Sequence, residues 1–203
     1  MPTIDPSERM YEENYRTMIS ATTPRPIGWI SSTSTEGVNN LAPFSHFNNV
    51  CTSTPVVMFS VGTLNTEGLK DTAQNVFNTE EFVVNVVTES LAEKMNRTAD
   101  SIPPGESEFE YADVEPAESR VVSPPRVADS VVSLECTLYD SQRVYTNDMF
   151  LGEVELIHIS DEVLTDGKID TEKIDTIGRL GGPFYTKLDR MNLTRTYEQK
   201  DIE

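Results

Sequence analysis

The sequence predicts a mostly β protein in which about six strands form a β-barrel, with short helices inserted between them. Apolar residues cluster into strand-like runs such as PVVMFSVG and EFVVNVV, and two later runs alternate apolar and polar residues as half-buried strands do. The segments between these runs are too short for the helices of a parallel doubly wound sheet. With 203 residues, the chain is expected to form a single domain over residues 1–203.

The first elements expected are a helix and a hairpin. Ser7 can cap a helix over residues 7–18. This helix is indicated by four residues near helical spacing: Met10, Tyr11, Tyr15 and Met18. The segment PIGWISS, residues 26–32, predicts a strand, and the turn residues after it have Glu36-Gly37 at their tip. Residues 40–47 lead back, so the sequence predicts a hairpin.

A strand, a helix and another strand are expected next. Residues 55–62 form a continuous apolar run, which predicts a strand buried on both faces. Residues 70–81 predict a helix and residues 82–87 a strand. The helix is indicated by three residues at helical spacing: Ala73, Val76 and Phe77.

Residues 90–100 predict a second short helix, with Ser90 as its cap and with Leu91 and Met95 on one face. Residues 101–126 are rich in Pro, Ser and Glu, which indicates a long loop rather than a linker between domains.

Two alternating strands are expected after the loop. Residues 132–140 place one set of side chains on one face and a second set on the other, namely Val132, Leu134, Cys136 and Leu138 opposite Ser133, Glu135 and Thr137. Residues 149–160 alternate as well, with Val154 and Leu156 opposite Glu153 and Glu155. The two strands are expected to pair.

Acidic residues are very unevenly distributed. The chain carries 34 Asp and Glu against 16 Lys and Arg, a formal charge of −18, yet Glu36 is the single acidic residue from Asn14 to Thr66. Either this stretch is buried, in a core or a subunit interface where unpaired charge is costly, or it receives an anion that carboxylates would repel.

The composition also limits location and partners. No apolar run is long enough to span a bilayer, and the N-terminus does not resemble a secretion signal, so a cytoplasmic protein is expected. The acidic surface disfavours nucleic acids and anionic membranes as partners. Dense carboxylates with only six lysines suggest a salt-loving host, the alternative being an ordinary acidic cytosolic protein. Cys51 and Cys136 are expected to be free, buried thiols.

Familiar nucleotide and zinc motifs are absent from the sequence. His46 and His158 have no third partner at suitable spacing, so no metal site is expected, and His158 at the end of an alternating strand is interpreted as structural. The acid-poor stretch is instead rich in neutral Ser, Thr and Asn side chains around Arg25. These groups suit a polar, phosphorylated ligand.

Lys70, Asp71 and Thr72 open a predicted helix, and a helix N-terminus beside a lysine and a threonine is a suitable phosphate site. A second explanation stays open for these residues, because Asp71 can be a helix cap and Lys70 a solvated charge.

Several segments occur in an order that resembles the flavin reductase-like family of FMN-binding split barrels, which includes flavoredoxin-type proteins. They are PRPIGWISS, NLAPFSHFNN, PVVMFSVG, KDTAQNV, EFVVNVV, FLGEV and GRLGG. The resemblance covers residues 15–190, and the N-terminal helix and a C-terminal extension flank this core. It implies a homodimer that binds FMN without a covalent link at the subunit interface.

The resemblance also implies which residues contact the cofactor. The strand around Trp29 and the NLAPFS segment would follow the flavin ring and ribityl chain, and Lys70 and Thr72 would hold the phosphate. The rings of Trp29 and Phe44 are equally compatible with a place in the core. The complete set of expected cofactor-binding residues is Trp29, Ser31, Ser32, Asn40, Ala42, Pro43, Phe44, Ser45, Lys70, Asp71 and Thr72.

The activity implied by the resemblance is that of an NAD(P)H:flavin reductase, with no catalytic acid or base supplied by the protein. Relatives often have a histidine before the Gly-Glu-Val strand, where this chain has Asn147. Two alternatives therefore stay open: an FMN electron-transfer protein with a redox protein as partner, and a flavin-binding module without activity. The GRLGG stretch, with Arg179, Gly181, Gly182 and Tyr185, can close over the site or form a simple glycine turn.

Overall fold

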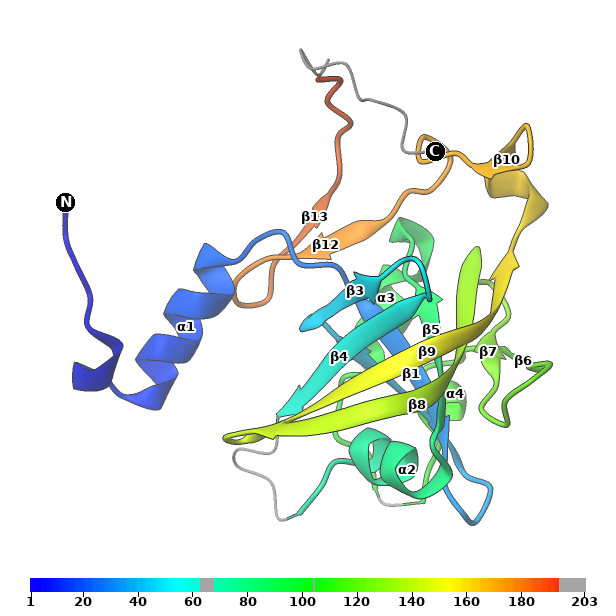
Figure 1. Cartoon of the computed structure of the whole chain (residues 1–203), viewed down its shortest axis with the longest axis horizontal. Coiled ribbons are helices and arrows are strands. Elements are labelled where there is room, and N and C mark those ends of the chain that lie inside the picture. Colours follow the sequence, from blue (N-terminus) through cyan, green and yellow to red (C-terminus); the bar gives the residue numbers. More distant parts are fainter. Residues whose placement is uncertain (63–67, 104, 194–203) are drawn as a thin grey trace.

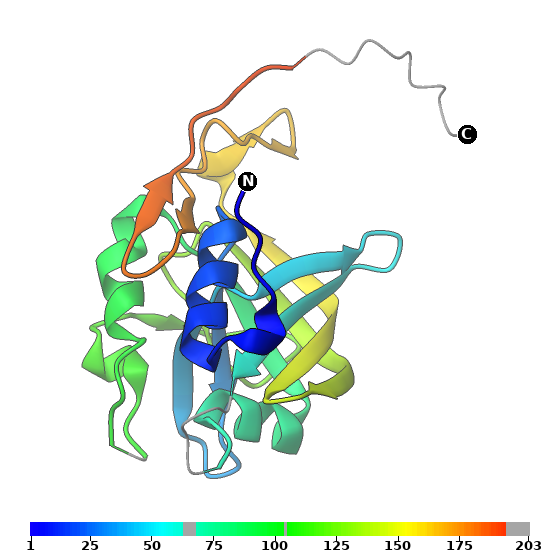
Figure 2. The same ribbon diagram turned by 90° about the vertical axis from the view of Figure 1, so that its left-hand side faces the viewer.

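The computed structural model describes residues 1–62, 68–103 and 105–193. Its main element is a seven-stranded antiparallel sheet with the strand order β2-β1-β5-β8-β9-β4-β3, which wraps around an apolar core (Figures 1 and 2). The strands are β1 Gly28–Thr33, β2 Asn39–Phe44, β3 Phe47–Cys51, β4 Val56–Gly62, β5 Glu81–Val86, β8 Val132–Val144 and β9 Asn147–Ile159. The predicted mostly β barrel with helical insertions is confirmed.

Short helices and small two-stranded sheets surround the barrel (Figure 1). The helices are η1 Pro6–Glu8, α1 Tyr11–Ala21, α2 Asp71–Thr79, η2 Glu89–Leu91, α3 Ala92–Arg97, α4 Glu108–Tyr111 and η3 Asp161–Val163. The small sheets pair β6 Pro116–Ala117 with β7 Arg126–Val127, β10 Leu164–Thr165 with β11 Lys168–Ile169, and β12 Ile177–Arg179 with β13 Tyr185–Lys187.

The predicted hairpin is present, whereas the helix caps proposed at Ser7 and Ser90 are wrong. β1 and β2 pair antiparallel, and Gly37 in their turn has a φ of +86°, which glycine adopts without strain. α1 begins at Tyr11 rather than Ser7, because Asp5 caps the separate η1 turn. Ser90 lies inside η2, for which Thr88 is the N-cap residue.

β1 separates two apolar clusters because successive side chains of a strand point to opposite faces. Trp29 packs with Leu91 and Met95 of the second predicted helix, which confirms the apolar face expected there. Ile30 faces the barrel interior together with Phe59, and the ring of Phe59 lies 5.1 Å from the ring of Phe150. The strand is therefore buried on both faces.

β4 is not buried on both faces, contrary to the prediction. The apolar run over residues 55–62 predicted burial on both faces, but Val57, Phe59 and Val61 are buried while Met58 and Ser60 are half-buried. One face of β4 covers the barrel interior, and the other borders the surface of the single chain. An apolar run of this length does not by itself distinguish the two cases.

The end of the predicted 101–126 loop, around Arg120 and Val121, is ordered and covers part of β8. Glu135 of β8 is fully buried, and its carboxylate accepts backbone N–H groups of Arg120 at 2.8 Å and of Val121 at 2.6 Å. His158 lies 2.5 Å from the same carboxylate, so its predicted structural role is supported. Burial raises the pKa of Glu135, but these hydrogen bonds together hold it below its usual value.

The two cysteines are free, as predicted, but only Cys136 is buried; Cys51 is half-buried at the end of β3. Burial raises the pKa of the Cys136 thiol. Among the residues that the structure describes, no group of three His, Cys, Asp or Glu side chains could hold a metal ion. In the same residues, no helix is long and apolar enough to cross a membrane.

Candidate functional site

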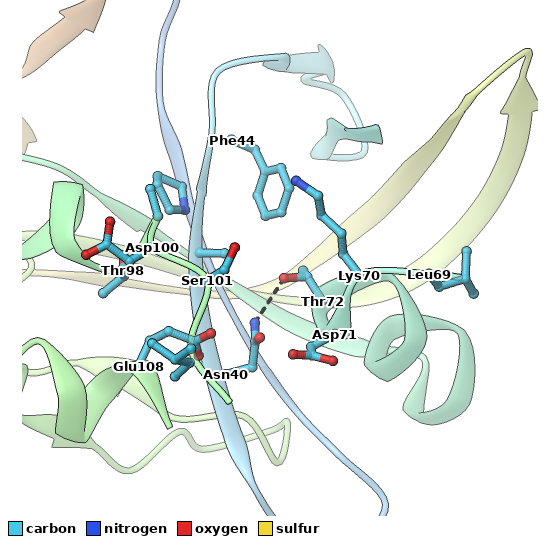
Figure 3. Close-up of a pocket in the computed structure, with 14 residues that line it drawn as sticks. Asn40, Phe44, Leu69, Lys70, Asp71, Thr72, Thr98, Asp100, Ser101 and Glu108 are labelled. Atoms are coloured by element: carbon cyan, nitrogen blue, oxygen red, sulfur yellow. Dashed lines mark hydrogen bonds between the residues drawn. The ribbon is translucent and has the colours of Figure 1, made fainter. Parts of the chain in front are cut away.

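A cavity of about 380 Å³ lies between β2, the start of α2 and the segment that follows α3 (Figure 3). We call it the Lys70 cavity. Seven of the predicted cofactor-binding residues line it: Asn40, Ala42, Pro43, Phe44, Lys70, Asp71 and Thr72. Two segments separated in the sequence thus meet at one site.

A buried hydrogen bond joins these two segments. The Asn40 side-chain amide donates to the Thr72 hydroxyl at 2.9 Å, and both side chains are buried (Figure 3). Behind them, the Asn75 amide of α2 donates to the hydroxyl of Ser32 on β1 at 3.1 Å. Because these bonds fix α2 against the β1–β2 hairpin, the helix N-terminus is held at the cavity wall.

Positive potential at the cavity comes from Lys70 and from α2. Lys70 is the N-cap residue of this nine-residue helix, and among the described residues no side-chain cap hydrogen bond to the first turn is present. These N–H groups and the helix dipole favour an anion. The Lys70 side chain extends toward Phe44 rather than toward the Asp71 carboxylate (Figure 3). The explanation of Asp71 as the helix cap is wrong, because Asp71 is the first helical residue.

Three carboxylates also line the Lys70 cavity, those of Asp71, Asp100 and Glu108. Of these, only Asp71 was among the residues predicted from the sequence. Burial raises the pKa of Glu108, and the charge of Asp71 raises it further. One oxygen of Glu108 accepts the Leu41 backbone N–H at 3.0 Å. Asp100 accepts a hydrogen bond from the Tyr111 hydroxyl at 2.9 Å.

The other four predicted residues do not line the Lys70 cavity. Trp29 is fully buried, and its indole N–H donates to Thr98 at 2.9 Å. The Ser31 hydroxyl donates to the Pro125 carbonyl at 2.5 Å, and Ser32 accepts the bond from α2. These side chains support the wall from behind. Ser45 lies in a neighbouring cavity.

Seven residues that line the cavity were missed by sequence reasoning: Leu69, Thr98, Ala99, Asp100, Ser101, Ile102 and Glu108. Most of them follow α3, which the sequence shows only as a short apolar helix face. The hydrogen bond from the Trp29 indole N–H on β1 to Thr98 holds this segment against the β1–β2 hairpin. No local sequence pattern predicts a contact between such distant segments.

The neighbouring cavity, of about 290 Å³, shares Pro43 and Ala99 with the Lys70 cavity. We call it the arginine cavity, because Arg25 and Arg179 both line it. The GRLGG stretch lies here, and its Gly182 and the nearby Tyr185 also contribute to the lining. The β12–β13 hairpin lies beside α3 (Figure 2), where the Tyr185 hydroxyl donates to Asn96 at 3.2 Å.

Asn147 is not among the residues that line either cavity. It begins β9, where its side-chain amide donates to the Ser60 hydroxyl at 3.1 Å.

Burial explains the scarcity of acid in only part of the stretch between residues 14 and 66, because α1 has no buried residue and most of β3 is exposed. This stretch supplies β1, β2 and β4, whose side chains Trp29, Leu41 and Phe59 belong to the two apolar clusters. An anion site does not account for it alone, because the other segments bring three carboxylates to the Lys70 cavity.

Comparisons with known proteins agree with this architecture. The model of the flavin reductase like domain family matches residues 20–173. An uncharacterized protein of Aquifex aeolicus is 44% identical over 174 residues, which cover 85% of this chain and 89% of that protein.

Two solved structures are similar over nearly the whole chain. Nitrilotriacetate monooxygenase component B of Bacillus cereus has a TM-score of 0.90 and 34% identity, covering 96% of this chain and 98% of that one. The 2-nitrobenzoate 2-nitroreductase NbaA of Pseudomonas fluorescens has a TM-score of 0.89 and 28% identity, with both chains fully covered.

The fold and the lined cavity define a split-barrel oxidoreductase of the flavin reductase type. The chain belongs to the flavin reductase like domain family.

Proposed function

We propose that the protein binds FMN non-covalently in the Lys70 cavity, at the interface of a homodimer, and acts as an NAD(P)H:flavin reductase. The observation that carries the proposal is the meeting of an apolar wall, a lysine and a helix N-terminus in one cavity of a flavin reductase family member. When bound, the flavin supplies hydride and single-electron chemistry.

The cavity residues suit the two ends of FMN. Ala42, Pro43 and Phe44 offer an apolar surface for a planar ring, while Lys70 and the first turn of α2 offer charge and N–H donors for a phosphate. The Asn40–Thr72 bond keeps these two parts at a fixed separation. The protein's role is then to bind and orient the flavin and to exclude water from one side of the ring.

The three carboxylates oppose a phosphate, and two of them are moderated by their surroundings. Burial raises the pKa of Glu108, and the Tyr111 hydroxyl donates a hydrogen bond to Asp100. We place the phosphate at the Lys70 end of the cavity, where the ammonium and the helix N-terminus act together.

The exposed face of α1 supports the homodimer. Figures 1 and 2 show α1 at one side of the barrel, and none of its residues is buried. Met10 is 68% exposed and Met18 63% exposed, with Tyr11 and Tyr15 on the same face of the helix. A contiguous apolar face of this kind is typical of a surface that a partner covers.

The dimer is tested by Met18→Glu, with Arg16→Gln as a control that changes the charge equally on the opposite face of α1. Light scattering should show a dimer for the natural protein and the control, and a dissociated species for Met18→Glu at the same concentration. A monomeric natural protein would contradict this part of the proposal.

The cofactor site is tested by Lys70→Ala, with the exposed Lys168→Ala as the matched control. Loss of a hydrogen bond to a charged group costs about 1.5–3 kcal/mol, so the FMN dissociation constant of Lys70→Ala should rise about 10- to 100-fold. The control should bind as the natural protein does. Equal affinity of the two variants would place the phosphate elsewhere.

One observation favours a second candidate, an FMN electron-transfer protein that receives electrons from a redox protein. Asn147, at the position where relatives often have a histidine, contacts Ser60 and lines neither cavity. Steady oxidation of NADH or NADPH with added FMN would support the reductase. An FMN-loaded protein that oxidises neither would favour the electron carrier.

A further inference from the structure

Two arginines face each other in the arginine cavity. The backbone N–H of Arg25 donates to the backbone carbonyl of Arg179 at 2.9 Å, and the backbone N–H of Arg179 donates to the backbone carbonyl of Arg25 at 2.9 Å. Residues paired in this antiparallel way project their side chains to the same face, and like charges directly opposite are destabilising. The fold thus maintains an unfavourable pair of cations.

No carboxylate compensates these cations in the part of the chain that the structure describes. Neither Arg25 nor Arg179 takes part in a salt bridge there, and no Asp or Glu lines the arginine cavity. The absence of acidic residues from this lining is unusual in a chain that has 34 of them. Burial lowers the pKa of Arg25, and the charge of Arg179 lowers it further.

Arg25 is held rigidly by the surrounding backbone. One Nη atom donates to the carbonyls of Ile19 and Thr22, the latter at 2.8 Å, and the other donates to the Leu180 carbonyl at 3.0 Å. Nε donates to the Ser45 hydroxyl at 3.3 Å. The charge of Arg25 is therefore fixed, while most of its donors are occupied.

Arg179 keeps more of its donors available. Its guanidinium lies over the Tyr185 ring, 4.3 Å from the centroid, and one nitrogen donates to the Gly182 carbonyl at 2.7 Å. A guanidinium has five N–H groups, and those that remain have no acceptor among the described residues. Its planar fork matches the two oxygens of a phosphate or carboxylate.

We propose that the arginine cavity binds an oxyanion, the phosphate or carboxylate group of the second reactant that exchanges electrons with the flavin. This inference rests on the proposed function, because the shared residues Pro43 and Ala99 place the arginine cavity directly beside the Lys70 cavity. An anion between Arg25 and Arg179 replaces the repulsion of the two cations by two attractions.

The first test uses inorganic pyrophosphate as the probe, with Arg179→Gln and the control Arg120→Gln, which removes the same charge from an exposed site. Calorimetric titration at fixed ionic strength should show that Arg179→Gln binds pyrophosphate about 10- to 100-fold more weakly than the natural protein. Arg120→Gln should bind it as the natural protein does, and both variants should keep their FMN affinity.

Three results would overturn the inference. The first is equal pyrophosphate affinity of Arg179→Gln and Arg120→Gln, and the second is no pyrophosphate binding by the natural protein. The third is a loss of FMN affinity in Arg179→Gln as large as in Lys70→Ala, because the anion would then be the phosphate of FMN itself. Failure of the FMN site alone is distinguished by Lys70→Ala, which leaves the arginine cavity intact.

The source of the oxyanion is found with pairs of reactants that differ only in charge. If the electron donor supplies it, Arg179→Gln should raise the KM for NADH about 10-fold or more and leave that for reduced nicotinamide riboside, which lacks phosphate, unchanged. If the acceptor supplies it, the same selective loss should appear for a quinone carboxylate against its methyl ester. Loss in neither pair would overturn the inference.

Discussion

The Lys70 cavity and the arginine cavity share a wall but differ in how their charges are arranged. The first combines one lysine and a helix N-terminus with three carboxylates, whereas the second has two arginines and no carboxylate among its lining residues. Mixed charge suits a ligand with a large neutral ring and one anionic end. Uncompensated positive charge suits an anionic group that binds and dissociates in each reaction cycle. From this contrast we propose the first cavity for the cofactor and the second cavity for the second reactant.

A buried carboxylate outside both cavities gives the largest expected effect. Glu135→Gln should lower the free energy of unfolding by about 3 kcal/mol, because it replaces the buried charged acceptor of the Arg120 and Val121 amides, and the partner of the His158 ring, by a neutral amide. Chemical denaturation measures this loss. Pyrophosphate and FMN affinities of the folded variant should not change, and a change in either would show that the cavities depend on the backbone around Arg120 and Val121 that covers Glu135.

The same carboxylate predicts an effect of pH on stability. Since hydrogen bonds hold the pKa of Glu135 below its usual value, the carboxylate stabilises the fold above the unfolded pKa of about 4.3. This contribution is lost as the pH falls through the lower, folded value. Denaturation curves of Glu135→Gln should therefore be flatter with pH in the acid range than those of the natural protein; parallel curves would contradict the assignment.

A crossed pair of variants tests the independence of the two cavities. Lys70→Ala should lose about 1.5–3 kcal/mol of FMN binding and Arg179→Gln a similar amount of pyrophosphate binding, each without the other loss. The double variant should show the sum of both effects to within about 0.5 kcal/mol, because the sites have separate partners. Strong coupling in the titrations would mean that one ligand occupies both cavities.

The carboxylates of the Lys70 cavity predict a gain rather than a loss. Glu108→Gln should bind FMN up to about 10-fold more tightly at neutral pH, because it removes a negative charge from the cavity at an effective dielectric of about 20. Because the pKa of Glu108 is raised, the natural protein should approach the variant as the pH falls through that pKa. Fluorescence titrations at several pH values measure this convergence, and a difference independent of pH would contradict it.

The smallest effect concerns the acidic surface as a whole. If the charge of −18 is an adaptation to salt, dilute buffer should lower stability by about 1 kcal/mol, since self-repulsion is no longer screened. Melting curves with sodium chloride and with sodium phosphate separate general screening from filling of the arginine cavity. An unchanged melting curve in dilute buffer would end the salt-loving interpretation.

The elements that the sequence predicted depend on local pattern. The hairpin around Gly37, the helix that begins at Asp71 and the paired strands β8 and β9 each follow from spacing and turn residues within a short segment. Helix ends were less predictable, because Asp5 and Ser7 are both competent caps and the structure uses Asp5.

The parts that could not be predicted depend on contacts between distant segments. Glu135 lies on the polar face of an alternating strand, and the distant backbone of Arg120 and Val121 covers it and binds its carboxylate. The same holds for Thr98, which lines the Lys70 cavity because Trp29 bonds to it. Arg25 was noted in the sequence among the neutral polar residues, but its pairing with Arg179 joins positions that are 154 residues apart.

The most direct test of the cofactor site is a fluorescence titration of FMN with the natural protein, Lys70→Ala and Lys168→Ala under identical conditions. The Lys70 cavity predicts saturable quenching with one flavin per chain, weakened in Lys70→Ala and unchanged in Lys168→Ala. Absence of saturable binding, or equal weakening in the two lysine variants, would contradict the assignment of FMN to this cavity.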